Sequence, residues 1–399
     1  MASIRKRTWE SGGKTQFRWV LDYQDQTGKR RLKTFKTKKA ADSWATDTLF
    51  QVKAGTHTPE SASVTAKEAG ERWIEQARHD GLERSTVTQY RQHLDLHIDP
   101  FIGAKKLSRL TVPMVKDFQR LLSEKGRSPQ MVTKITSSLG SILSEAQENG
   151  LVSQNVVREM QQRKRHQRGQ AKRHKRKLEI GKDIPDKDEI RAILATAKGR
   201  WRPFVVKALF TGMRASELRG LTWANVDLEG KTLTVRQRAD KWNDIGSPKS
   251  EAGEREIPLA PMVVNTLREW KLTCPHQNRT KDHPGELHYV FPNTIGNVES
   301  HSNVHSRGFI PLQIAAGVTV DTGETDEDGK PILKAKYGLH ALRHAAASLF
   351  IEQGMKPKRV QEIMGHSTIS MTLDTYTHLY PAPEDDQAAM AQLQARLLG

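Results

Sequence analysis

Three segments in the C-terminal half of the chain carry side chains that could act together on a phosphate group. They contain Arg214, the pair His340 and Arg343 three residues apart, and His366 followed ten residues later by Tyr376. The two guanidinium groups stay charged and donate paired hydrogen bonds to phosphate oxygens. A phenol has a pKa of about 10, and it becomes a useful nucleophile where cationic donors surround the phosphate that it attacks. Each segment therefore carries groups suited to chemistry on a phosphate, and Tyr376 is a candidate nucleophile.

Each segment is weak when it is read alone. An arginine three residues before a glutamate, as Arg214 stands before Glu217, is usually part of a surface ion pair. Pairs such as His340 and Arg343 arise often by chance, and a lone tyrosine after a helix is far more often a half-buried packing residue. The hypothesis therefore depends on all the segments occurring in one chain.

Taken together, the segments resemble the tyrosine recombinase (phage integrase) family, of the arm-binding integrase type. The match is to the family's Arg, His-x-x-Arg, Gly-His and Tyr boxes, in the same order. Lys249, just before a strand-like stretch at 254–259, resembles the family's hairpin lysine. The resemblance is strong over residues 185–383. It is looser over 64–155, where the family has a core-site-binding domain, and over 1–55, where it has an arm-site-binding domain.

The resemblance implies a role for each matched residue. Arg214 and Arg343 would clamp the scissile phosphate, and His340 and His366 would hydrogen-bond it and assist proton transfer. Lys249 would act as general acid and protonate the leaving 5′ oxygen, because an ammonium group can donate a proton and a guanidinium practically cannot.

Tyr376 is implied to form a 3′-phosphotyrosyl link with DNA. That bond conserves the energy of the phosphodiester, so rejoining would need no nucleotide cofactor. The arginines and the lysine would supply the positive charge that a metal supplies elsewhere. We therefore expect neither a cofactor nor a metal. Glu217 is expected to brace the site, with a surface ion pair as the alternative.

Turn and capping residues indicate the elements that carry these side chains. Gly212 ends one helix, and the arginine two residues later opens the next. Asp186 and Glu189 have capping-box spacing, which predicts the first helix of the C-terminal unit. Strand-like stretches at 231–237 and 254–259 predict a hairpin around Lys249.

The N-terminal part of the chain predicts two further units. Residues 15–35 predict a small sheet with a turn at 25–28, and the helix after it begins at Thr37 and ends at Gly55. A unit of four helices is expected at 64–155. Their predicted starts are Thr65, Ser85, Thr111 and Ser128.

The positive charge is concentrated in two segments. The formal net charge is +18, and residues 1–55 contain 13 Lys and Arg against 5 Asp and Glu, a net +8. Residues 156–182 contain 11 against 2, a net +9, which leaves +1 for the other 317 residues. Such charge favours a polyanionic partner, and DNA is the obvious one. The stretch 156–184 is expected to be a linker along DNA, and the alternative is a solvated tail and a solvated linker.

Three other features invite functional interpretation. Cys274, His276, His283 and His288 suggest zinc, but they lack recognised ligand spacing, and an ordinary loop is favoured. Residues 317–336 predict a hairpin inserted before His340, with an open role. The C-terminal stretch 384–399 predicts a short amphipathic helix that docks on a neighbouring protomer or folds back on its own domain, two equally favoured alternatives. Its apolar residues are Ala388, Ala389, Leu393 and Leu397.

The expected protein is a multidomain, mainly helical chain with small β-sheets. It comprises a tyrosine-recombinase catalytic domain, a helical core-binding domain and a small N-terminal α/β arm-binding domain. The expected partners are double-stranded DNA attachment sites and, on DNA, three further copies in a homotetramer. A DNA-bending or directionality accessory protein is a possible further partner.

Location and rival functions complete the expectations. No apolar run is long enough to cross a bilayer, and the charged N-terminus does not predict a signal peptide. Cys274 is the only cysteine, so no intramolecular disulfide can form, which fits the cytoplasm. The rival functions are a type IB topoisomerase and a non-catalytic DNA-binding protein.

Overall fold

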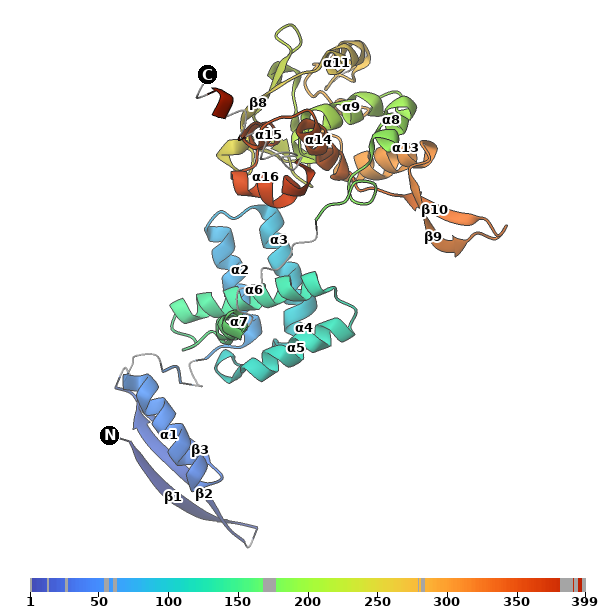
Figure 1. Cartoon of the computed structure of the whole chain (residues 1–399). Helices are drawn as coiled ribbons and strands as arrows, with labels where there is room; N and C mark the ends of the chain where they lie inside the picture. The colour runs from blue at the N-terminus through green and yellow to red at the C-terminus, as the bar shows by residue number, and fades with distance from the viewer. Residues whose placement is uncertain are drawn as a thin grey trace. The chain divides into compact units, whose positions relative to one another are not determined.

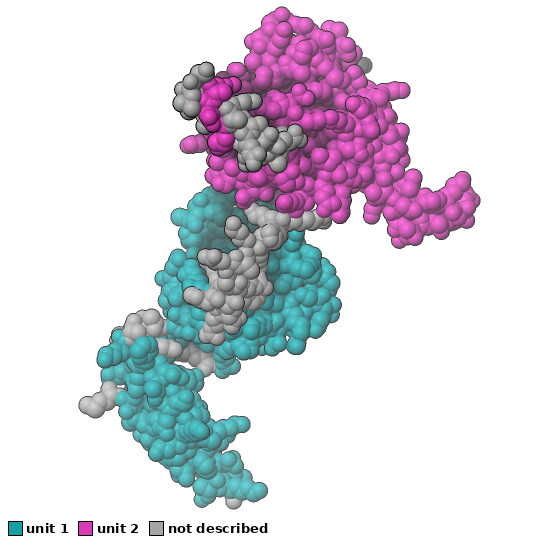
Figure 2. Space-filling view, in the orientation of Figure 1, with its two compact units in different colours: residues 1–172 teal, residues 173–399 magenta. Residues whose placement is uncertain are grey.

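The computed structural model describes residues 2–12, 14–25, 28–53, 57–59, 63–167, 177–278, 280, 284–380, 390 and 394–396. Over these residues the chain is mainly helical with small antiparallel sheets, which confirms the expected fold class. It divides into two compact units, Met1–Lys172 and Arg173–Gly399 (Figure 2). No helix in the described part of the chain is both long and apolar enough to cross a membrane.

The first unit begins with a three-stranded antiparallel sheet, in the order β1-β2-β3, followed by a helix that packs on it (Figure 1). Leu21 and Tyr23 of the central strand are buried with Ala45 of the helix. The two ends of the expected turn are joined by the amide of Gly28, which donates to the carbonyl of Asp25 at 2.9 Å, and residues 26–27 lie outside the described residues. The elements are β1 (Ser3–Ser11), β2 (Lys14–Gln24), β3 (Arg30–Phe35) and α1 (Lys38–Lys53).

The sequence predicted only two of these strands. The first strand was missed because it lies at the edge of the sheet and nearly all its side chains are exposed. Its sequence therefore lacks the alternation of apolar and polar residues that marks a half-buried strand.

The rest of the first unit is a helical bundle. The capping box of Thr65 and Glu68 is confirmed, and Thr111 and Ser128 cap the helices that they were expected to begin. The core centres on α6, whose Ile135 and Leu139 are fully buried. The elements are α2 (Ala66–His79), α3 (Arg84–His93), the π-helical turn η1 (Leu94–Ile98), α4 (Asp99–Ile102), η2 (Leu107–Arg109), α5 (Val112–Glu124), α6 (Pro129–Glu148) and α7 (Val156–Gln167).

Helix α7 corrects the expected end of the helical unit at residue 155. Val156, Val157 and Met160 are buried in the same core as α6. Asn155 joins the two helices, because its side-chain amide donates to the carbonyl of Gly140 at 2.8 Å while its side-chain oxygen accepts from the amide of Val157 at 3.2 Å. The start of the supposed linker is therefore a packed helix. The sequence prediction overlooked this helix because the basic residues that follow outnumber its three apolar residues, which have helical spacing.

The second unit contains the segments singled out for chemistry. Its helices are α8 (Lys187–Thr196), α9 (Trp201–Thr211), α10 (Ala215–Gly220), α11 (Pro261–Thr273), α12 (His301–Asn303), α13 (Ile310–Ala315), α14 (Ala341–Glu352), α15 (Pro357–Met364) and α16 (Ile369–Tyr376), with the short turns η3 (Trp223–Asn225), η4 (Glu251–Gly253), η5 (Val304–Phe309) and η6 (Thr377–Leu379). Its strands are β4 (Val226–Asp227), β5 (Thr232–Val235), β6 (Arg238–Ala239), β7 (Ile245–Gly246), β8 (Arg255–Pro258), β9 (Thr319–Thr325) and β10 (Pro331–Ala335).

Helix α9 is the centre of this unit, because most of its residues are buried and it contacts both α11 and α14. The capping box of Asp186 and Glu189 is confirmed. The expected pairing of 231–237 with 254–259 is confirmed as β5 against β8, with Leu233 opposite Ile257. The expected inserted hairpin is confirmed as β9 and β10, a two-stranded ribbon that projects from the unit (Figure 1).

Candidate active site

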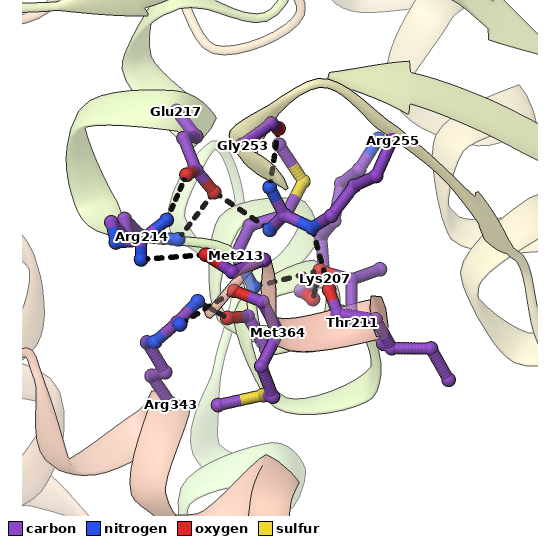
Figure 3. Close-up of polar contacts among 12 residues, drawn as sticks. Lys207, Thr211, Met213, Arg214, Glu217, Gly253, Arg255, Arg343 and Met364 are labelled. Atoms are coloured by element: carbon purple, nitrogen blue, oxygen red, sulfur yellow. Dashed lines mark hydrogen bonds and ion pairs between the residues drawn. The ribbon is translucent and has the colours of Figure 1, made fainter. Parts of the chain in front are cut away.

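Three arginines meet at the C-terminal end of helix α15, where successive backbone carbonyls accept from three different guanidinium groups (Figure 3). Arg255 donates to the carbonyl of Ile363 at 2.6 Å, Arg343 to that of Met364 at 2.6 Å, and Arg214 to that of the next residue at 2.9 Å. The last carbonyls of a helix have no partner within the helix and carry partial negative charge. The end of α15 therefore gathers cations and orients them.

Glu217 supplies the carboxylate of this cluster. One of its oxygens accepts from Nη1 of Arg214 at 2.7 Å, and the other accepts from Nη2 of Arg255 at 2.9 Å. The Glu217 side chain is 2% exposed. Desolvation opposes ionisation, but the nearby charges and hydrogen bonds of Arg255 and Arg214 outweigh it and lower the pKa of this carboxyl. The surface-pair alternative is therefore wrong, and Glu217 is a buried brace.

Arg343 lies deeper than Arg214. It also donates to the carbonyl of Gly212, the residue that ends α9. Burial and the like charge of Arg214 lower its pKa to about 9, which still leaves it charged at neutral pH. Among the residues that the structure describes, this cluster thus contains three guanidinium groups and one carboxylate, that of Glu217, and has net positive charge.

Two glycines make this arrangement possible. Gly212 and Gly365 end α9 and α15 with φ of 61° and 63°, in the left-handed region. A Cβ on Gly365 would lie 2.7 Å from a guanidinium nitrogen of Arg255, and one on Gly212 would lie 2.5 Å from the sulfur of Met364. Only glycine fits both the backbone angle and the space at these two positions.

Tyr376, the last residue of α16, is buried beside the cluster and is 1% exposed. Its hydroxyl hydrogen-bonds Nδ1 of His344 at 2.7 Å, and its ring stacks near that of His366 with centroids 6.4 Å apart. Burial raises the pKa of the phenol to about 12, although the charge of Arg343 acts in the opposite direction. The hydroxyl therefore needs a proton acceptor, and His344 is in contact with it.

The histidines around Tyr376 are held neutral. Burial, followed by the charges of neighbouring histidine and arginine groups, lowers the pKa values of His344 and His366 to about 4. His366 also hydrogen-bonds Thr372 through Nδ1 at 2.8 Å. The ring of His340 lies 4.7 Å from that of His344, and desolvation followed by the charges of Arg343 and Arg214 lowers its pKa, although the residue still reaches solvent.

The structure thus brings together five of the six expected site residues: Arg214, His340, Arg343, His366 and Tyr376. The sixth, Lys249, is exposed in the connection between β7 and η4. The turn η4 that follows this connection borders the cluster, because the carbonyl of its last residue, Gly253, accepts from Arg255 at 2.8 Å.

Sequence reasoning assigned no role to Arg255 or His344. Arg255 stands in the strand after the expected lysine, and the partner that reveals its role, Glu217, is 38 residues away in sequence. His344 directly follows the His-x-x-Arg box, which was the available signal, but its contact with Tyr376 spans 32 residues. Such contacts cannot be read from local spacing.

The suspected zinc ligands and the expected C-terminal helix add no residue to this cluster. Cys274 is buried, and burial raises the pKa of its thiol to about 11. The described residues contain no group of three His, Cys, Asp or Glu side chains placed to hold a metal ion, and His283 lies outside them. The apolar residues of the expected C-terminal helix, Ala388, Ala389, Leu393 and Leu397, also lie outside them.

Two family models match the chain over most of its length. The phage integrase family model matches residues 185–382, and the phage integrase central domain model matches residues 67–163. The chain belongs to the phage integrase family of tyrosine recombinases. The resemblance inferred from the sequence is confirmed, and with it tyrosine-type site-specific recombinase activity. The non-catalytic alternative is set aside.

Relatives of this integrase-family chain are similar along 74% to 97% of its length. A "Tyrosine recombinase XerC-like" protein of Caldanaerobacter subterraneus is 24% identical, covering 94% of this chain and 96% of the relative. A "Putative prophage phiRv2 integrase" of Mycobacterium tuberculosis is 25% identical, covering 97% and 94%. The ICEBs1 integrase of Bacillus subtilis is 24% identical over 74% of each chain.

Solved integrase structures share the fold. The Tn1549 transposon integrase, in complex with a circular intermediate DNA, has a TM-score of 0.62 at 20% identity and covers 83% of this chain and 100% of its own. A lambda integrase dimer bound to a core site has a TM-score of 0.57 at 18% identity, covering 91% and 92%.

Replacement of Gly365 with alanine should damage the arginine cluster. We expect the left-handed backbone to cost about 1–2 kcal/mol, and the clash with Arg255 to displace a guanidinium group and slow DNA cleavage on the order of 100-fold. Gly354→Ala is the matched control, because Gly354 has φ of 75° and open space where a Cβ would lie. Equal cleavage rates for the two variants, measured on a suicide substrate, would contradict the assigned packing.

The neutral histidines predict acid sensitivity of the catalytic unit. The pKa values of His344 and His366 are about 4 in the folded chain, whereas an unfolded imidazole titrates near 6.5. The unfolded state therefore binds more protons between these values. The stability contributed by the neutral rings is complete above about pH 6.5 and is lost as the pH falls toward 4.

This loss can be measured as a fall in Tm by calorimetry across that pH range at constant ionic strength. The variant His344→Gln/His366→Gln lacks both titrating rings, so its Tm should fall less steeply. An unchanged slope in the double variant would show that other groups govern the acid sensitivity.

Proposed function

We propose that this chain integrates and excises a mobile element by site-specific recombination between DNA attachment sites, with a 3′-phosphotyrosyl intermediate at Tyr376. The observation that carries the proposal is the excess of positive charge at the end of α15. Arg214 and Arg255 bind the carboxylate of Glu217, whereas Arg343 binds backbone carbonyls, and Tyr376 lies close enough to Arg343 to affect its pKa. A phosphodiester would supply the missing negative charge, and the guanidinium groups would stabilise the charge that develops during its attack.

The residues of the site can supply both proton transfers that cleavage of the DNA strand requires. The hydroxyl oxygen of Tyr376 attacks phosphorus as its proton passes to the neutral ring of His344, whose Nδ1 contacts the hydroxyl at 2.7 Å. The bond from phosphorus to the 5′ oxygen breaks, and Lys249 donates a proton to that oxygen. Arg214 and Arg343 hold the phosphate, assisted by His340. Rejoining is the reverse reaction, with a 5′ hydroxyl as the nucleophile and no cofactor.

The other parts of the chain are proposed to bind DNA. The helical bundle and the catalytic unit would hold the core of the attachment site, and residues 1–55 would bind a separate arm site. The lambda integrase has been solved as a dimer on a core site and as a tetramer on a Holliday junction. We propose the same tetrameric assembly here, in the cytoplasm where the DNA substrate lies, with an accessory protein setting the direction.

Tyr376→Phe should abolish the covalent protein–DNA complex and leave DNA binding nearly unchanged, because it removes one oxygen and little packing surface. The measurement is a denaturing gel after incubation with a suicide substrate. Tyr380→Phe is a matched control, since Tyr380 also has a buried hydroxyl, which has no hydrogen-bond partner among the described residues. A covalent band that persists in Tyr376→Phe would overturn the assignment, and a band that disappears in Tyr380→Phe would point to Tyr380 as the nucleophile.

Deletion of residues 1–59 should separate cleavage from integration. The cut follows His57, because its Nε2 hydrogen-bonds the hydroxyl of Tyr23 at 2.8 Å and thus belongs to the N-terminal sheet. The truncated chain should cleave a short substrate containing only the crossover core at the normal rate. It should integrate full-length attachment DNA poorly, since the second contact that raises local concentration is lost. Equal loss of both activities would refute a separate arm-binding role.

A further inference from the structure

Arg219 is a buried cation that the proposed mechanism does not use. It lies in the same short helix, α10, as the residues that follow Arg214, and it is 1% exposed. A charge buried this deeply is tolerated only when hydrogen bonds replace its lost water. The groups that accept those bonds therefore show which part of the fold Arg219 holds in place.

The contacts of Arg219 converge on the hairpin formed by β6 and β7. Its Nη1 donates to the carbonyls of Ala239 at 3.3 Å and Asp240 at 2.9 Å, and its Nη2 donates to the side-chain oxygen of Asn243. Its Nε donates to the carbonyl of Glu299 at 2.6 Å. Three of these four acceptors belong to one strand end and its turn.

The turn is closely fitted to the end of α10. A side-chain oxygen of Asp240 accepts from the amides of Trp242 at 2.8 Å and Asp244 at 2.9 Å, and Asn243 has φ of 71°. Gly220, next to the buried arginine, lets the hairpin approach, because a Cβ there would lie 2.8 Å from the backbone nitrogen of Ala239. Helix and hairpin are thus fixed against each other.

The hairpin leads directly to Lys249. Strand β7 ends at Gly246, three residues before the lysine. After strand β7, Pro248 packs closely on Gly253. A Cβ added to this glycine would lie 2.4 Å from the Cβ of the proline. The carbonyl of Gly253 accepts from Arg255 at 2.8 Å. The stretch 247–253, which carries Lys249, is therefore anchored at one end by the hairpin and at the other by the arginine cluster.

We propose that Arg219 is a positioning residue for Lys249: it fixes the β6–β7 turn and so holds the lysine where it can protonate the leaving 5′ oxygen. This inference rests on the proposed role of Lys249 as general acid. Helix α10 begins directly after Arg214, which belongs to the phosphate clamp. Near the C-terminal end of α10, Arg219 holds the β6–β7 hairpin, which leads to Lys249. One rigid helix sets the spacing between them.

Single-turnover cleavage of two suicide substrates tests this inference. One has an ordinary scissile phosphodiester, and the other has a 5′-bridging phosphorothiolate, whose sulfur leaves with little protonation and so bypasses the acid. The variants are Arg219→Lys, which keeps the charge and loses the planar fork, and Asn243→Gly, which keeps the left-handed turn and removes only the side-chain acceptor. Trp270→Phe is the control for general destabilisation, because it removes the 2.6 Å bond to the carbonyl of Val290, outside the hairpin.

We expect both variants to slow the ordinary substrate, Arg219→Lys on the order of 10- to 100-fold, because small misplacements of a reacting group have effects of this size. On the phosphorothiolate substrate both should cleave within about threefold of wild type, since protonation is no longer required. In a Lys249→Ala background, Arg219→Lys should have little further effect on the ordinary substrate, as expected for residues acting as a unit. Trp270→Phe should change the cleavage rates of the two substrates by the same factor.

The outcomes separate this inference from the function on which it rests. If Lys249→Ala is slowed equally on both substrates, the general-acid assignment fails. If the phosphorothiolate rescues Lys249→Ala but neither Arg219→Lys nor Asn243→Gly, the acid assignment stands and the positioning role of Arg219 is overturned. Unchanged cleavage of the ordinary substrate by both variants also overturns it. If Arg219→Lys does not fold, as judged from its Tm, the half-buried Asn243→Gly decides the question.

Discussion

The end of helix α15 is the constraint on which the candidate site depends. Three successive carbonyls, from Ile363 to Gly365, accept from three different arginines that reach them from a helix cap, a strand and a second helix. Guanidinium groups held this close repel one another, and a helix terminus offsets part of that repulsion with fixed partial charges that need no reorganisation. The site is therefore organised before any phosphate arrives, because its cations are fixed by backbone atoms.

Glu217 completes this arrangement at a cost in stability. A buried carboxylate is expensive to desolvate, and replacing buried ion pairs by apolar groups is often neutral or stabilising. The role of Glu217 is to orient the arginines, since its one carboxylate fixes the guanidinium planes of both Arg214 and Arg255. Because Glu217 neutralises only one of the three guanidinium charges, the cluster keeps a net positive charge. A phosphate-binding site requires such a charge. Stability and function thus place opposite demands on the same few atoms.

The sequence predicted those features that local signals determine. Capping boxes at Thr65 and Asp186 placed two helices, because the capping side chain and its partner are three residues apart. The five clustered site residues were expected together only through resemblance to a family, since no spacing within the chain predicts that α10, α14, α15 and α16 converge. Arg255 escaped notice for the same reason. Helix α7 was missed because a strongly basic composition outweighed three apolar residues.

The hairpin of β9 and β10 has a consequence for engineering of the chain. Its two ends, Thr319 and Ala335, are paired directly opposite each other. The ribbon therefore enters and leaves the unit at almost one point, and its side chains beyond Val320 are mostly exposed. A segment attached in this way can lengthen, shorten or change its sequence without altering the path of the chain on either side. It is a suitable location for grafting a reporter peptide.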